Sequence, residues 1–117
     1  MDHVYRKAAK IWEERKMTLS EKRCLFTSML AMLIRHANAL GYGVNIDCVK
    51  CYLPGHHRKG SVHYDGLAAD LNLFKGGKLL QDDESYGVLH DYFDSIGGAA
   101  RIPGDLRHFS VEHNGVR

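Results

Sequence analysis

The spacing of apolar residues changes after Gly41, and this change limits what the chain can fold into. Over residues 20–40 the apolar positions recur at helical spacing and cover much of the circumference, which predicts a core helix ended by Gly41. The same periodicity predicts an amphipathic helix over residues 4–16. Beyond the glycine, apolar and polar residues alternate as they do on strands. We therefore expect a helical part over 1–41 and a sheet part over 42–117.

The sheet part contains several strand patterns and one further helix pattern. The helix pattern starts with the acidic residues 82–84, which favour a helix N-terminus, and ends at Gly97. Residues 75–78 (Lys-Gly-Gly-Lys) predict a tight turn between two paired strands. The strand patterns cover residues 44–52, 67–74, 79–80 and 108–113. This order predicts an α+β fold in which N-terminal helices pack on a small antiparallel β-sheet.

Length and charge exclude several classes of protein. A chain of 117 residues has room for a single domain, and 44% hydrophobic with 26% charged residues is typical of a folded globular protein. Sixteen basic against fourteen acidic residues give a net charge of +2, so we expect no nucleic-acid or membrane partner. Three irregularly spaced cysteines predict no disulfide framework. The first twelve residues do not resemble a signal peptide, so we expect synthesis in the cytoplasm and delivery to any outside target by another factor.

The densest group of chemically reactive side chains lies between residues 61 and 70. His63 and Asp70 would be about 23 Å apart on an extended chain, so they can share a metal only if the chain reverses between them. Gly66 suits that reversal, because glycine adopts the backbone angles that tight turns need. A catalytic zinc usually has three His or carboxylate ligands and one open position. His108 is the predicted third ligand.

An acidic residue precedes this histidine by three positions. Asp105 follows Pro103-Gly104, so it is expected in a turn beside the metal ligands, where a carboxylate can take a proton from water and return it to a leaving amine. Glu112 is the competing acid. On an extended strand it would share the face of His108 but lie about 13 Å further along, and we rank it well below Asp105.

Other residues near these motifs have two readings each. Ser61 either orients a ligand or substrate from just outside the ligand shell, or caps the turn. Cys48 and Cys51 have the spacing of a redox or zinc motif, but they lie in a predicted strand, and buried apolar cysteines are the preferred interpretation. Residues 56–59 (His-His-Arg-Lys) with Lys50 form either a basic rim for acidic substrates or a solvated loop.

Two motifs together resemble a known family of zinc peptidases. The pattern Ser-x-His-x-x-Gly-x-Ala-x-Asp spans residues 61–70, and Gly-Asp-x-x-His-Phe-Ser spans residues 104–110. Both are similar to motifs of the D-alanyl-D-alanine carboxypeptidase family, which includes phage endolysins that cut L-alanyl-D-glutamate bonds. The phage branch is the most similar, and the likeness covers roughly residues 42–116. It implies the fold shared by these peptidases, the lysostaphin-type peptidases and the hedgehog signalling domain.

The resemblance also implies roles for individual residues. Zinc would be held by His63, Asp70 and His108, with Asp105 as the general acid/base. Many relatives carry an arginine in an acidic-x-x-Arg arrangement before the first motif, and the nearest equivalent here runs from Asp47 to Lys50. A lysine still supplies a positive charge for an oxyanion or a substrate carboxylate, but it lacks the planar fork of arginine.

The expected function is therefore a zinc-dependent peptidase acting on peptidoglycan stem peptides, as a monomeric phage endolysin. Two actions remain open: cleavage of the L-alanyl-D-glutamate bond as an endopeptidase, and removal of a terminal residue as a D,D-carboxypeptidase. Two other functions are the alternatives. One is a cell-wall-binding module that keeps the fold without cutting, and the other is a virion-associated lysin that thins the wall during entry.

Overall fold

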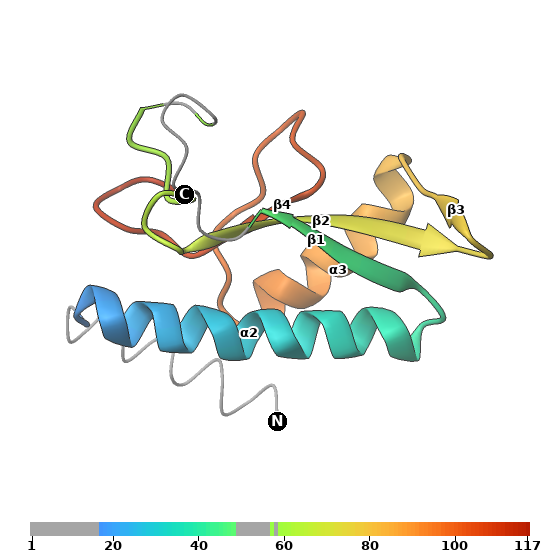
Figure 1. The fold of residues 1–117 in the computed structure, drawn as a ribbon, viewed down its shortest axis with the longest axis horizontal. Coiled ribbons are helices and arrows are strands. Elements are labelled where there is room, and N and C mark those ends of the chain that lie inside the picture. Colours follow the sequence, from blue (N-terminus) through green and yellow to red (C-terminus); the bar gives the residue numbers. More distant parts are fainter. Residues whose placement is uncertain (1–16, 49–56, 58) are drawn as a thin grey trace.

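The computed structural model describes residues 17–48, 57 and 59–117, and the helix expected over residues 4–16 lies outside them. The described part has the expected α+β architecture, with two helices and an antiparallel sheet (Figure 1). The elements in chain order are α2 (Leu19–Ala39), β1 (Gly43–Cys48), β2 (Ala68–Lys75), β3 (Lys78–Leu79), α3 (Asp83–Ser95) and β4 (His108–Ser110).

Local capping sets the ends of the long helix α2. The Thr18 side chain accepts a hydrogen bond from the Glu21 amide at 3.2 Å, and the Glu21 carboxylate accepts one from the Thr18 amide at 3.0 Å. This capping box satisfies two amides at the helix start, so the helix begins slightly before Ser20, where the sequence analysis placed it. At the other end Gly41 has a φ of +92°, the left-handed conformation that stops the helix as expected.

Strand β2 is the centre of the sheet. It pairs antiparallel with β1, β3 and β4. Asp70 has a backbone partner on each side, Cys48 in β1 and His108 in β4. A register irregularity between Ile46 and Cys48 interrupts the β1 ladder beside this point. Asp70 therefore lies in the interior of the sheet, with a neighbouring strand on either side.

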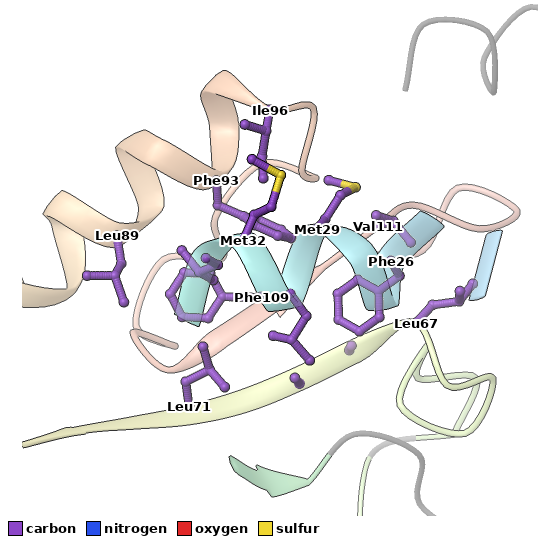
Figure 2. Packing of buried hydrophobic residues seen from close by; sticks show 14 of the residues in the cluster. Phe26, Met29, Met32, Leu67, Leu71, Leu89, Phe93, Ile96, Phe109 and Val111 are labelled. Carbon is purple, nitrogen blue, oxygen red and sulfur yellow. The ribbon is translucent and has the colours of Figure 1, made fainter. Parts of the chain in front are cut away.

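Both helices pack on one face of the sheet, and α2 runs along that face in Figure 1. Leu71 and Phe109 from the sheet face the helix residues Met29, Met32 and Phe93 in the core (Figure 2). Side chains alternate between faces along a strand, so the half-buried residues of β2 between its buried leucines lie on the opposite face. Asp70 is one of these residues, so its side chain lies on the face of the sheet away from the helices. None of the helices within residues 17–48, 57 and 59–117 combines the length and apolar character of a membrane span.

The last strand is shorter than the sequence suggested. It was expected to continue to His113, but β4 ends at Ser110. Ser110 pairs with Ala68, the first residue of β2, and beyond it only the Val111 amide still bonds to the Leu67 carbonyl. The partner strand has ended there, so the ladder cannot continue. Glu112 consequently lies outside the sheet and is exposed.

Candidate metal centre

A tight turn returns the chain to the sheet between His63 and Asp70. Within it the Tyr64, Asp65 and Gly66 amides donate to the carbonyls three residues earlier, at 3.1, 3.1 and 3.2 Å. Gly66 has a φ of +74°, which is the reversal predicted for this glycine. The turn brings the His63 imidazole back over the start of β2.

Two polar side chains fix this turn from either end. The Ser61 hydroxyl is buried and accepts a hydrogen bond from the His63 amide at 3.2 Å. Serine often caps a turn in this way, by accepting from the amide two residues further along the chain. The Arg23 guanidinium of α2 donates through Nε to the Asp65 carbonyl at 2.6 Å. The long helix thus anchors the turn that carries His63.

The third member of the group arrives through strand pairing. His108 is the first residue of β4 and lies directly opposite Asp70 of β2. Residues directly opposite in an antiparallel pair project from the same face with their Cβ atoms about 4.5–5.5 Å apart. Register alone therefore places the His108 imidazole beside the Asp70 carboxylate.

The Asp70 carboxylate lies between the two imidazoles. Asp70 Oδ1 lies 3.4 Å from His63 Nε2 and 3.7 Å from His108 Nδ1. Two donors bound about 2.1 Å from a tetrahedral ion would be about 3.4 Å apart, so each spacing is close to that of a pair of ligands on one cation. The two imidazoles are almost fully buried, with 2% and 5% of their surface exposed. The three side chains named from the sequence thus lie beside one another, and the described group whose ligand atoms all lie within 4.8 Å of one another is His63 and Asp70 with His57.

Electrostatics keeps this carboxylate ionised. Burial alone would raise the pKa of Asp70, but hydrogen bonds from the His108 and His63 side chains, together with their charges, outweigh it and hold the pKa well below its usual range. On the far sides of the rings, His63 Nδ1 and His108 Nε2 are buried without a hydrogen-bond partner in the described residues. Two ring nitrogens beside one carboxylate need either protons or a cation between them, and the 3.4 Å between His63 Nε2 and Asp70 Oδ1 suits a cation.

Asp105 lies at the edge of the same site. Its Oδ2 is 4.0 Å from His108 Nδ1, and 49% of its side chain is exposed. Its amide donates to the Ile102 carbonyl at 3.0 Å, and its own carbonyl accepts from the His108 amide at 3.3 Å, so a turn holds it just before β4. A pocket of about 250 Å³ is lined by His57, Ser61, His63, Asp70, Ile102, Asp105, His108 and Arg117. Asp105 therefore faces the same space as the three donors.

His57 belongs to this site, whereas the sequence analysis assigned it to a basic rim or a solvated loop. Its ring stacks on the His63 ring with centroids 3.9 Å apart and planes 3° from parallel. The Tyr64 hydroxyl accepts from the His57 amide and donates to the His57 carbonyl, both at 2.8 Å. The three residues His57, His63 and Asp70 each offer one ligand atom, and these atoms all lie within 4.8 Å of one another. This group can therefore hold a metal ion. The sequence offered only the nearness of His57 to the motif.

Replacing His57 with Ala is expected to weaken metal binding at least about tenfold, because it removes one of three donors that lie within 4.8 Å of one another, and even outer partners of a metal ligand typically contribute 10- to 100-fold in affinity. His63 would lose the ring on which it stacks, and the site would lose a nearby donor. Calorimetric titration with Zn²⁺ measures the change. The matched control is His36→Ala, since His36 also stacks on an aromatic ring, that of Tyr92, but joins α2 to α3. Equal affinities in the two variants would show that His57 is not part of the metal site.

His90 is a second residue that the sequence analysis left without a role. It is buried on α3, its Nε2 donates to the Leu106 carbonyl at 2.7 Å, and its ring stacks on Phe109 at 4.1 Å. Burial lowers the pKa of His90, and the Leu106 carbonyl opposes this only in part, so the ring is held neutral. His90 thus fixes the segment between Asp105 and His108. In the sequence, the position of His90 on the apolar face of the predicted helix was the sign that its side chain is buried.

Several sequence-predicted residues lie outside the described part of the chain. They include Lys50, Cys51, His56 and Arg58. The role expected for the Lys50 cation therefore stays a prediction. Cys48 is described only as the last residue of β1.

Comparisons with protein-family models, curated proteins and solved structures each return no match.

Proposed function

We propose that this chain is a zinc-dependent peptidase with the fold of the DD-peptidase and hedgehog group, hydrolysing peptide bonds in peptidoglycan stem peptides. The observation that carries the proposal is that His63 and His108 both lie beside Asp70 in one pocket, which Asp105 also lines. Two imidazoles and one carboxylate are the ligand set of a catalytic zinc, which keeps a further position open.

The residues around the pocket fit the roles that such a reaction requires. Zinc bound by the three donors would supply Lewis-acid activation of water and of the scissile carbonyl. Asp105 is close to His108 but half exposed, which suits a group that exchanges protons rather than one that binds the ion. It accepts a proton from the attacking water and donates it to the leaving amine as the carbon–nitrogen bond breaks. Lys50 is proposed to stabilise the oxyanion, together with the metal.

The choice of peptidoglycan as substrate depends on the resemblance of the two motifs. Support comes from the fact that motifs about 40 residues apart, at 61–70 and 104–110, contribute to one pocket. The phage endolysin type is proposed on the same ground. Analysis of the products distinguishes cleavage within the stem peptide from removal of its terminal residue.

Digestion of purified cell walls tests the proposal. The zinc-loaded protein is expected to release new amino groups from the wall, and a chelator should abolish the release until Zn²⁺ is restored. Mass spectrometry of the muropeptides then identifies the bond. A protein that pellets with the wall but releases no amino groups would contradict the peptidase and support the wall-binding alternative.

A further inference from the structure

A second hollow lies next to the metal site. It has a volume of about 390 Å³ and shares Asp105 with the first pocket. Leu79, Leu80 and Leu106 give it apolar walls, and Arg107 supplies a cation. Because Asp105 contributes to both hollows, a peptide that spans them passes directly over the proposed proton donor.

The orientation of Arg107 is set by neighbours on the sheet. Its Nη1 donates to Asn72 Oδ1 at 2.8 Å and lies 3.5 Å from Asp47 Oδ2. Asn72 is itself fixed, because its Nδ2 donates to Asn45 Oδ1 at 2.9 Å. The backbone of Arg107 is held as well, since its carbonyl accepts from the Leu71 amide at 2.9 Å.

These contacts occupy only one corner of the guanidinium. Within the described residues, Nε and Nη2 of Arg107 make no hydrogen bond, so the edge that they form is open to a ligand. That edge matches the two oxygens of a carboxylate, and such bidentate pairs are among the strongest hydrogen bonds in proteins. Asp47 neutralises the charge only in part, because it is exposed and its contact is long.

We propose that the second hollow is a subsite for the residue on the leaving side of the scissile bond, and that Arg107 selects a residue that bears a carboxylate. This inference builds on the proposed function: Asp105 protonates the leaving amine, so the hollow beyond it receives the leaving residue. The leucines contact the aliphatic part of that residue, and the open guanidinium edge binds its carboxylate.

Binding to the zinc-free protein tests the subsite without turnover. The probes are N-acetyl-L-alanyl-D-glutamate and its diamide, in which neutral amides replace both carboxylates, and binding is followed by calorimetric titration of each protein. The acid is expected to bind more tightly, and Arg107→Gln should weaken its binding by about 10- to 100-fold while leaving the diamide nearly unchanged. Arg107→Lys should recover only part of the affinity, because it lacks the fork. Arg35→Gln, an exposed arginine on α2, is the matched control.

The outcomes separate this inference from the proposed function. If the two probes bind equally well, or if Arg107→Gln binds the acid as the wild type does, the subsite is refuted even when the zinc-loaded protein digests cell walls. If the acid binds selectively through Arg107 but walls are not digested, a carboxylate-binding site at Arg107 stands, whereas the peptidase and the leaving-side assignment do not. Selective binding together with Arg107-dependent hydrolysis of the acid probe supports both.

Discussion

Replacing Asp105 with Asn is expected to lower turnover of wall peptides by about 10²- to 10⁴-fold while the protein still binds zinc, because general acid–base catalysis contributes about this much. Asn has the same shape as Asp but cannot accept the proton of the attacking water. The Asp105 side chain is half exposed and its Oδ2 lies 4.0 Å from His108 Nδ1, a distance too long for a strong hydrogen bond, so the fold should tolerate the change. The measurements are kcat/KM on the cleaved peptide and metal content per chain.

The matched control for this prediction is Glu112→Gln. Glu112 was the competing acid in the sequence analysis, and it lies exposed beyond the end of β4, outside the residues that line the pocket. It should keep wild-type turnover. A fully active Asp105→Asn protein would exclude Asp105 as the proton carrier, and an inactive Glu112→Gln protein would move that role to the other acid.

The parts of the fold that sequence predicts well are those set by short-range physics. The end of α2 at Gly41 and the reversal at Gly66 both depend on backbone angles that glycine adopts easily, so each can be predicted from local sequence. The hairpin between β2 and β3 follows from the Lys-Gly-Gly-Lys turn for the same reason. The length of β4 could not be predicted in this way, because it depends on where its partner strand begins.

The candidate site shows the same division. The motif spacing identified His63 and Asp70, and the local turn explains how they meet. The pairing of Asp70 with His108 depends on the register between β2 and β4, which sequence indicates only through the resemblance. His57 and His90 were missed because their roles arise from ring stacking and from a contact between distant elements, and only His90 had a local signal, its position on the apolar face of the helix.

The contact of Asp47 illustrates what spacing along one strand cannot indicate. The acidic-x-x-basic arrangement of Asp47 and Lys50 remains a prediction, because Lys50 lies outside the described residues. The Asp47 carboxylate lies 3.5 Å from Arg107 Nη1, 60 positions away in sequence. Such a contact depends on how distant segments meet in the fold, so local spacing gives no sign of it.

Replacing His63 with Ala is expected to abolish high-affinity zinc binding and all turnover that depends on it. His63 Nε2 lies 3.4 Å from Asp70 Oδ1 and is one of the three proposed ligands, so Asp70 and His108 alone would form an incomplete set. The clearest readout is thermal. A ligand that binds only the folded state at about 100 times its Kd stabilises it by about 2.7 kcal/mol. For a domain of this size this corresponds to a rise in Tm on the order of 10 °C.

Wild type should therefore show a large Tm rise with Zn²⁺, and His63→Ala should show almost none. Comparing each protein with and without Zn²⁺ separates loss of the ion from any loss of packing at this buried position, because only the difference reports binding. His108→Ala should behave in the same way, and the double variant should lose no further zinc response, since the donors act as a unit. His36→Ala keeps the full response if the ion binds where proposed. A full response in either ligand variant would mean that Zn²⁺ binds elsewhere on the chain.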